Sequence, residues 1–216
     1  MVTPAAGEPV LSRGSPLNVP QPGDAPWRLF VAIDVPGAFR AALAVALTRM
    51  PLGLDRAVRW APPAGVHLTL RFLGDVDPGG VDALREPLTD AARRSARFML
   101  KLGEPGAFPS LRRPRVLWLG IGGEMERLKR LHGRIEGGLS RAGFEPDDRP
   151  LTPHLTAGRV RAGVPPRDLA ALGGAFAALP LPSPSPEFEV DEVVLFRSHL
   201  TPAGARYERV HAAPLG

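Results

Sequence analysis

The sequence predicts an α+β fold with antiparallel sheets, arranged as two lobes of similar design. Short strand-like segments alternate with helix-like segments, and the links between them are short. The order strand, helix, strand, helix occurs twice along the chain, although the two halves share little sequence. The last part of the chain reads as hairpin-like strand pairs, which favours antiparallel over parallel pairing.

Composition is that of a globular protein. The chain has 216 residues, of which 44% are hydrophobic and 23% charged, enough for a sizeable core. No apolar run reaches the roughly 18 residues needed to span a bilayer, so we expect no membrane contact. Residues 1–25 are rich in proline and small residues, and we expect a disordered extension there, without a secretory signal. Residues 26–216 then form the folded part.

Cysteine is absent, which excludes disulfides, thiolate catalysis and cysteine-based zinc sites, and fits the cytoplasm. The formal net charge is +5, and of the 27 basic residues only Lys101 and Lys129 are lysines. Arginine suits phosphate because its planar guanidinium donates two parallel hydrogen bonds. A basic surface of this kind permits nucleic-acid binding without proving it.

The first half of the chain begins with a buried strand at 27–33. Pro36 suits the start of a helix running to residue 50, since a proline at the first helical position loses no hydrogen bond. Short strands are expected at 58–60 and 66–73, separated by a Pro-Pro-Ala-Gly turn. Apolar residues at helical spacing then predict a helix over 78–96.

The second half predicts strands at 98–102 and 116–121. In residues 124–142 the apolar positions recur in steps of three and four, which indicates a helix packing one stripe on a sheet, and Gly143 suits its end. A strand at 154–160, a helix at 166–176 and closing strands at 190–196 and 206–211 complete the series.

Two His-x-Thr-x motifs lie in predicted strands, His67-Leu68-Thr69-Leu70 and His154-Leu155-Thr156-Ala157. Side chains alternate faces along a strand, so each histidine shares a face with its threonine, about 6–7 Å away, while the intervening leucine faces the core. Two such strands facing each other would surround a phosphate with two imidazoles and two hydroxyls. One motif alone is a weak signal, but two copies in a chain with five histidines are not.

These four groups fit the opening of a 2',3'-cyclic phosphate. One neutral imidazole accepts a proton from the attacking water, and one imidazolium donates a proton to the departing ribose oxygen. Histidine titrates near pH 6.5, so a pair can supply one base and one acid. The threonine hydroxyls can bind the non-bridging oxygens. This chemistry requires no metal and no cofactor, and we expect neither.

Other chemistries find less support. A zinc site built from His67, His154 and a third histidine is possible, but no His/Asp/Glu spacing supports it. The chain has no Gly-x-Ser-x-Gly nucleophile elbow and no phosphate-binding P-loop. The remaining histidines stand outside any motif: His132, His199 and His211.

The chain resembles the two-histidine phosphoesterases, and among them the bacterial and archaeal RNA 2',3'-cyclic phosphodiesterases, also called 2'-5' RNA ligases. The resemblance covers residues 27–212. It is carried by the two motif segments, by residues 28–33, 108–109 and 113–120, and by a closing hairpin through residues 195–207.

The resemblance implies a bilobal fold with two antiparallel sheets flanked by helices, related by a pseudo-two-fold axis, with a central groove. It implies hydrolysis of RNA cyclic ends to 2'-phosphomonoesters, with His67 as proton donor and His154 as proton acceptor. Thr69 and Thr156 would bind the phosphate. This assignment of donor and acceptor comes from the resemblance, because the two motifs by themselves do not distinguish the two histidines.

Three arginines are further candidates for contact with the phosphate or the adjoining nucleotide: Arg71, Arg115 and Arg159. For Arg115 and Arg159 a surface ion pair is an equal alternative. Strand parity places Arg71 on the face of His67 and Thr69 and places Phe72 in the core, unless a bulge intervenes. Between Arg71 and Phe72, Arg71 is therefore the stronger groove candidate.

Three functions remain open at this point. The first is hydrolysis of cyclic phosphate ends on RNA, and the second is 2'-5' ligation of such an end to a 5'-hydroxyl at the same site. The third is a non-catalytic module that binds RNA ends. In each case the partner is RNA with a cyclic or related end, and we expect a monomer.

Overall fold

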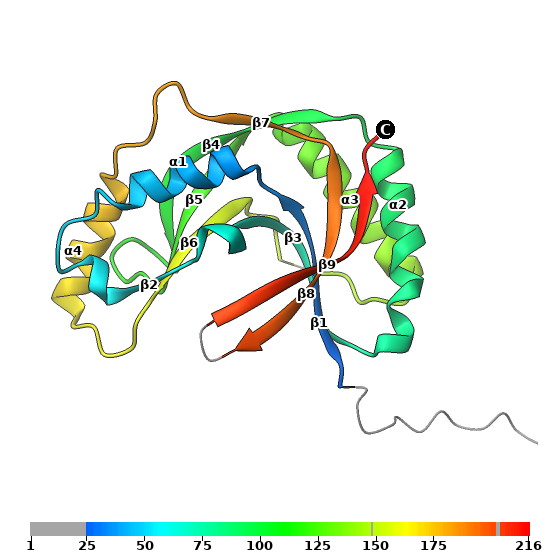
Figure 1. Ribbon diagram of the computed structural model, residues 1–216, viewed down its shortest axis with the longest axis horizontal. Helices are drawn as coiled ribbons and strands as arrows, with labels where there is room; N and C mark the ends of the chain where they lie inside the picture. The colour runs from blue at the N-terminus through cyan, green and yellow to red at the C-terminus, as the bar shows by residue number, and fades with distance from the viewer. Residues whose placement is uncertain (1–24, 148, 202–203) are drawn as a thin grey trace, which may run out of the picture.

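The computed structural model describes residues 25–147, 149–201 and 204–216 as one curled antiparallel sheet with helices packed around it (Figure 1). The predicted extension at 1–25 lies, up to residue 24, outside the described residues. In the described part of the chain, no helix combines the length and apolar character needed to cross a membrane. The α+β class predicted from the sequence is confirmed.

Nine strands make up the sheet in the described residues, and every pairing between them is antiparallel. The order across the sheet is β7-β4-β5-β6-β3-β1-β8-β9, with β2 paired to β6. The strands are β1 (Trp27–Asp34), β2 (Val58–Trp60), β3 (His67–Val76), β4 (Phe98–Phe108), β5 (Val116–Gly123), β6 (His154–Val160), β7 (Glu187–Val190), β8 (Glu192–Thr201) and β9 (Gly204–Pro214).

The two halves of the sheet join between the motif strands. Here β3 and β6 share one residue pair, Leu68 with Leu155, and both side chains are fully buried. The prediction of two separate sheets is therefore wrong in this respect. One residue pair is enough to join the two halves into one sheet, and a sequence pattern cannot distinguish such a junction from a gap between two sheets.

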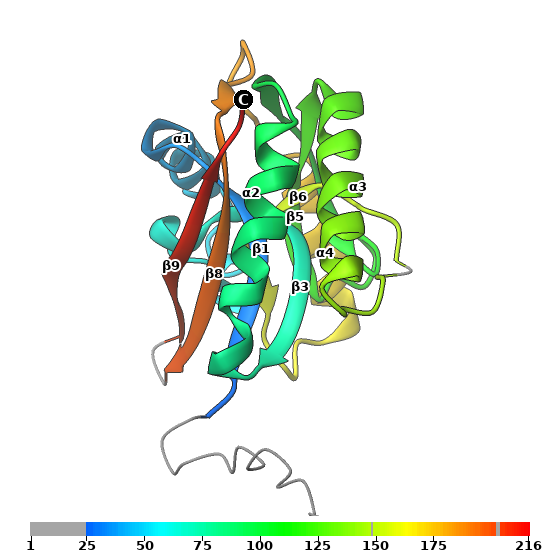
Figure 2. The same ribbon diagram turned by 90° about the vertical axis from the view of Figure 1, so that its right-hand side faces the viewer.

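Four α-helices accompany the sheet in the described ranges: α1 (Gly37–Leu47), α2 (Arg85–Arg93), α3 (Met125–Arg141) and α4 (Pro166–Ala177). Helices α2 and α3 lie side by side (Figure 2), so closely that a Cβ on Gly138 would stand 3.2 Å from Pro87. The α3 stripe predicted from its spacing is buried, at Leu128, Leu131, Ile135 and Leu139. Gly143 follows α3 with φ of 90°, a backbone conformation that favours glycine at a helix end.

Burial divides the sheet into two faces. The main core lies between the sheet and the helices, and it includes Leu68 and Leu155 of the motif strands. A separate small cluster lies on the other face, formed by Phe30, Ala32, Val194 and Phe196. The residues across from Thr69 and Phe72 in β3 belong to this small cluster, so the motif side chains project on this face.

Some predicted elements have different bounds. Residues 78–84 form two short 3₁₀ turns before α2, because Pro78 and two glycines follow one another there. The strand predicted at 98–102 continues to Phe108, and β7 was not predicted. Its four residues, bounded by prolines and Asp191, are too few for a periodic signal.

The prediction for Arg71 is wrong. The pairing of β3 with β1 shifts between Thr69 and Arg71, so Leu70 is an extra residue and the alternation of side chains reverses beyond it. Arg71 is buried, with its guanidinium 3.2 Å from the Glu136 carboxylate and bonded to the Glu145 carbonyl. Phe72 is 59% exposed instead, and its ring lies 6.1 Å from that of Phe30 on the small-cluster face.

Replacing Arg71 with methionine is expected to lower the free energy of unfolding by about 2–3 kcal/mol, because Glu136 would remain half-buried without its partner. Chemical denaturation measures this loss. Arg93→Met, which removes a highly exposed ion pair, should cost less than about 1 kcal/mol. If Arg71→Met instead loses substrate affinity while its stability is unchanged, Arg71 binds the substrate.

Candidate active site

Both motif histidines have the same local geometry. His67 Nδ1 lies 2.8 Å from the carbonyl oxygen of Gly65, and His154 Nδ1 lies 2.7 Å from that of Thr152. A carbonyl oxygen only accepts, so Nδ1 carries the proton in each ring. In the neutral ring Nε2 is then an unprotonated acceptor, and this bond fixes both the tautomer and the orientation of the ring.

The threonines stand on the same face as their histidines. Thr69 pairs with Ala32 across β1 and β3, and Thr156 pairs with Trp118 across β5 and β6. Both threonines are half-buried, while Leu68 and Leu155 between them and the histidines are fully buried in the main core. The alternation predicted for the first three residues of each motif is confirmed.

Each motif strand bulges directly after its threonine. In β6 the pairing shifts between Thr156 and Gly158, as it does between Thr69 and Arg71 in β3. Residue Arg159 therefore occupies in β6 the place that Phe72 occupies in β3. Gly158 takes the place of Arg71, and it must be small because a Cβ there would stand 2.6 Å from Val58 and 2.9 Å from Trp60.

Aromatic rings surround His67 on three sides. Phe30 stacks on the imidazole at 4.7 Å between ring centroids, Tyr207 meets it edge-on at 4.9 Å, and Phe196 lies at 6.1 Å. These rings come from β1, β9 and β8. They exclude water from much of the imidazole and hold its plane, which an isolated strand could not do.

His154 has its own aromatic neighbours, from β4 and β5. Phe108 meets the imidazole edge-on at 5.1 Å, and Trp118 lies at 5.9 Å. The Trp118 ring rests over Gly106, where an added Cβ would stand 2.2 Å from it. The sequence analysis missed these aromatic groups, because rings from five different strands meet here only through the sheet order.

Burial lowers the pKa of His67 to about 4. The loss of hydration is the largest cause, opposed by the Gly65 carbonyl and the Asp34 carboxylate, while Arg40 and His154 lower the pKa further. In the ligand-free protein His67 is therefore neutral at pH 7. An anion in front of the ring would raise its pKa, because opposite charge favours the imidazolium.

This shift makes stability depend on pH. The folded-state pKa of about 4 lies below the unfolded value near 6.5, so the unfolded chain binds more protons between these limits. His67 should therefore reduce the free energy of unfolding by up to about 3 kcal/mol as pH falls from 7 to 4. Denaturation curves of wild type and His67→Gln measure this, and equal pH dependence of the two would contradict the shift.

The remaining predicted arginines, Arg159 and Arg115, are both exposed. Arg159 is exposed, pairs directly with Arg59 across β2 and β6, and lowers the otherwise raised pKa of Tyr207, so its charge is close to the ring beside His67. Burial is the larger influence on Tyr207 and raises its pKa. Arg115 is exposed and its backbone pairs with Phe108 and Val160, but no contact among the described residues joins its side chain to the motif groups.

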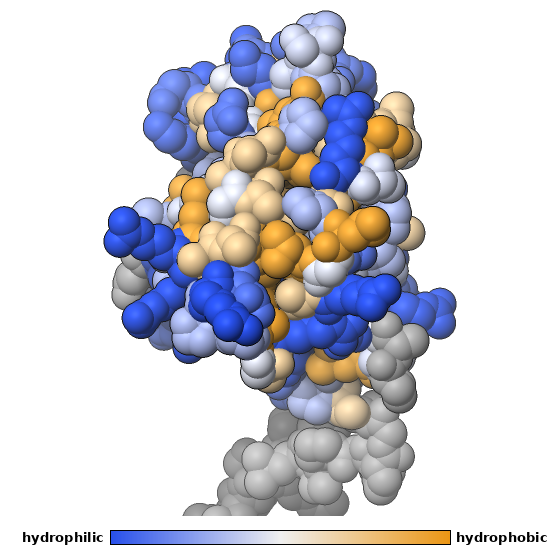
Figure 3. Space-filling model, turned by 90° about the vertical axis from the view of Figure 1, so that its left-hand side faces the viewer, coloured by the Kyte–Doolittle hydropathy of each residue, from blue (hydrophilic) through white to orange (hydrophobic). Residues whose placement is uncertain are grey.

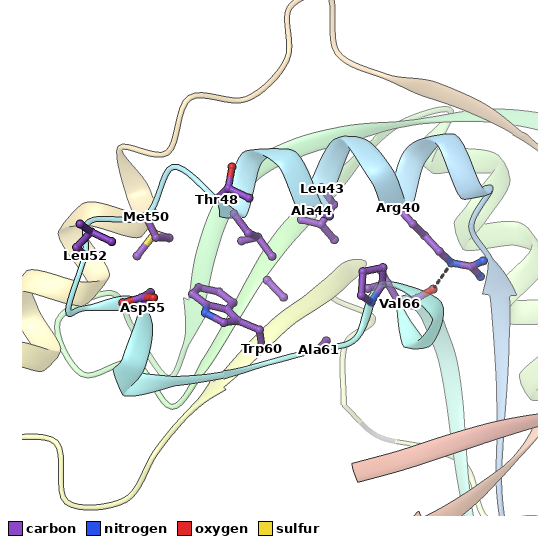
Figure 4. Close-up of a pocket in the computed structure, with 13 residues that line it drawn as sticks. Arg40, Leu43, Ala44, Thr48, Met50, Leu52, Asp55, Trp60, Ala61 and Val66 are labelled. Carbon is purple, nitrogen blue, oxygen red and sulfur yellow. Dashed lines mark hydrogen bonds between the residues drawn. The ribbon is translucent and has the colours of Figure 1, made fainter. Parts of the chain in front are cut away.

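A cavity of about 350 Å³ lies elsewhere, between α1 and the segment that runs through β2 (Figure 4). Val66 and Ala157 line it, and each is next in sequence to a motif histidine or threonine. Its other walls are mostly apolar, and none of the four motif groups lines it. This cavity therefore adjoins the main core behind the motif strands and is distinct from the candidate active site.

The end of the molecule that carries α4 and the link from α1 to β2 shows apolar patches among charged side chains (Figure 3). Leu52, in that link, is 97% exposed.

In the residues that the structure describes, no three His, Asp or Glu side chains are grouped so that they could hold a metal ion.

Known proteins share much of this sequence. The 2'-5' RNA ligase superfamily profile matches residues 40–202. The RNA 2',3'-cyclic phosphodiesterase of Geobacillus stearothermophilus is 36% identical over 158 residues, 72% of this chain and 47% of its own length. The chain thus spans about half of that relative. The enzyme of the same name from Methanothermobacter thermautotrophicus is 32% identical over 83% of this chain and 94% of its own length.

Solved structures share the fold. The structure of TT0787 from Thermus thermophilus has a TM-score of 0.71 at 30% identity, covering 87% of this chain and 97% of that one. E. coli LigT complexed with 3'-AMP has a TM-score of 0.70 at 28% identity, covering 88% of this chain and 98% of LigT. The fold is therefore of the LigT type, an antiparallel sheet curled among helices. The chain belongs to the 2'-5' RNA ligase superfamily.

Proposed function

We propose that this protein is an enzyme that hydrolyses 2',3'-cyclic phosphate ends of RNA to 2'-phosphomonoesters. The observation that carries the proposal is the matched geometry of the two histidines. In each, Nδ1–H donates a hydrogen bond to the backbone carbonyl oxygen two residues earlier, which leaves Nε2 as the reactive atom. Two relatives at 36% and 32% identity carry the name RNA 2',3'-cyclic phosphodiesterase.

The proposed reaction adds one water molecule across a P–O bond. Nε2 of His154 accepts a proton as the water oxygen attacks phosphorus. The P–O3' bond breaks, and His67, protonated at Nε2, donates its proton to the departing O3'. The products are a 2'-phosphate and a free 3'-hydroxyl, and the two histidines end with exchanged protonation states, which solvent restores.

The hydroxyls of Thr69 and Thr156 bind the non-bridging phosphate oxygens in this proposal, where charge grows during attack. Since a neutral His67 cannot donate from Nε2, the bound phosphate anion must raise its pKa, and the imidazole takes up a proton from solvent as the substrate binds. Metal and cofactor take no part in these steps. An assay in EDTA, which removes free divalent metal ions, tests whether the reaction proceeds without metal.

We propose further that the groove lies between two halves of common design. The half with β1 and β3 matches the half with β5 and β6, including the bulge after each threonine. Asp34 lies across from His67, and Gly120 lies across from His154. A pseudo-two-fold relation of this kind would face the two Nε2 atoms toward one phosphate.

The rest of the RNA would lie along the arginine rim. Arg59 and Arg159 stand directly opposite each other across β2 and β6. Like charges in this position are unfavourable, and a phosphodiester between them would remove the repulsion. Arg115 is a weaker candidate for the same strand of RNA. That the enzyme acts as a cytoplasmic monomer stays a prediction.

The test is a defined oligoribonucleotide with a 2',3'-cyclic end, incubated with the protein in EDTA. Analysis of the end groups should show a 2'-phosphate and no 3'-phosphate. Recovery of only the cyclic end, from protein whose fold is verified by circular dichroism, would contradict the proposal. RNA binding without turnover would indicate the non-catalytic module instead.

Ligation is the second candidate, favoured by the description of the matched superfamily. A ribose 5'-hydroxyl would replace water as the nucleophile and form a 2'-5' bond at the same site. Adding a 5'-hydroxyl oligonucleotide to the assay distinguishes the two, because ligation lengthens the RNA.

A further inference from the structure

A carboxylate stands beside one motif histidine. Asp34 ends β1 and pairs directly with His67 across β1 and β3, so the two side chains share the face that carries Phe30 and Ala32. The Asp34 side chain is 27% exposed. The Asp34 carboxylate makes no hydrogen bond to the imidazole, because Nδ1–H of His67 donates to the carbonyl oxygen of Gly65. Asp34 therefore acts on His67 through its charge.

Two arginines hold Asp34 in place. Arg40 of α1 binds one carboxylate oxygen, and Arg209 of β9 donates to the other at 3.0 Å. Arg209 is fixed in turn by Glu192 of β8 at 2.5 Å. The carboxylate is therefore clamped from both sides, by elements far apart in the sequence.

Arg40 also reaches the chain that leads into the motif. Its Nε donates to the carbonyl oxygen of Val66 at 3.3 Å, the contact drawn as a dashed line in Figure 4. Val66 immediately precedes His67. A single side chain thus connects the carboxylate to the backbone that carries the imidazole, and it sets their distance.

No hydrogen bond or ion pair among the described residues joins the second histidine, His154, to a carboxylate. Gly120 lies across from His154 in β5, and the rings nearest His154 belong to Phe108 and Trp118. The charged or titratable groups that act on His67 come from β1, α1, β6 and β9. They are Asp34, Arg40, His154 and Tyr207. Within this set only Asp34 has a carboxyl group.

We propose that Asp34 is a positioning residue that makes His67, rather than His154, the proton donor. The clamped carboxylate stabilises the imidazolium form of His67 once the substrate phosphate is bound. This inference rests on the proposed function for its catalytic meaning. Its electrostatic part concerns the protein itself and can be tested without turnover.

Asp34→Asn tests the charge while keeping the shape of the side chain. We expect the pKa of His67, followed by NMR with saturating inorganic phosphate, to fall by roughly 0.5–1 unit, at the low end for an opposite charge because two arginines share it. Asp75→Asn is the matched control, since Asp75 is a highly exposed residue of β3 paired with Arg28.

The pH–rate profile provides the readout that a merely structural role would not move. A donor must be protonated, so the rate falls as pH rises above its pKa. In Asp34→Asn this descending limb should move to lower pH by the same roughly 0.5–1 unit, which lowers the rate on that limb about 3- to 10-fold. KM at low pH should change little.

Arg40→Lys separates the charge from the clamp. Lysine keeps the positive charge but cannot hold Asp34 and Val66 together through a planar fork. We expect kcat to fall while the His67 pKa moves by less than in Asp34→Asn. Thermal melts of all variants show whether each is folded.

Several outcomes would overturn the inference. An unchanged His67 pKa in folded Asp34→Asn would remove its electrostatic basis, and a shift of the ascending limb would make His67 the base. If wild type shows no turnover but the NMR shift is present, the proposed function fails while the electrostatic role of Asp34 stands.

Discussion

Replacing either His67 or His154 with alanine should lower kcat/KM on a cyclic-phosphate oligonucleotide by roughly 10²–10⁴-fold. In the proposed mechanism each imidazole performs a different proton transfer at Nε2, and an alanine side chain can perform neither. Removing both should cost much less than the product of the single effects, since residues that act as a unit are not additive. Initial rates at limiting substrate give kcat/KM for each single variant and for the double variant, and rates at saturating substrate give kcat.

His199→Ala is the control for this pair. The His199 side chain is 41% exposed and bonds to Glu208 at 2.7 Å, and His199 belongs to neither motif. We expect its kcat/KM to stay within about twofold of wild type. Retention of wild-type rates by His67→Ala or His154→Ala, in protein with an unchanged melting temperature, would refute the two-histidine mechanism.

The second large effect concerns the junction of the two half-sheets. Leu68→Ala should lower the free energy of unfolding by about 2–5 kcal/mol, because it opens a cavity at a fully buried side chain. Leu68 pairs with Leu155, and these two residues form the pairing between β3 and β6. Chemical denaturation followed by circular dichroism measures the loss.

Leu68→Ala should also weaken phosphate binding, because His67 and Thr69 flank the lost side chain on β3. Titration with inorganic phosphate measures this below the unfolding transition. Leu200→Ala, at a 69% exposed position, is the control and should change stability by less than about 0.5 kcal/mol. Equal effects of the two substitutions would show that the junction is not a structural support.

The motif strands could be predicted because each part of their signal is local. The bounds of β2 and β6 agree with prediction, and the α3 stripe is buried as its spacing indicated. Leu68 and Leu155 are buried, as alternation requires. These features depend on residues close together in sequence, where a period of two or of 3.6 is visible.

The arginine and aromatic neighbours could not be predicted in the same way. A bulge at Leu70 reverses the alternation, so Arg71 enters the core and Phe72 reaches the face of the sheet that carries His67 and Thr69. A bulge depends on how a strand pairs with its neighbour, and the sequence of one strand does not encode this. Arg159 lies on the same face as His154 and Thr156 because β6 has the same bulge.

The sequence by itself determined which groups the proposed chemistry uses: two imidazoles and two hydroxyls, paired on strands by alternation, without cysteine or a nucleotide-binding loop. The tertiary structure decided what distinguishes the two histidines. Phe30, Phe196 and Tyr207 come from three strands to remove water from His67 and lower its pKa, while Asp34 opposes that shift. Desolvation and charge act through space, so they depend on which strands lie side by side and not on which residues follow one another.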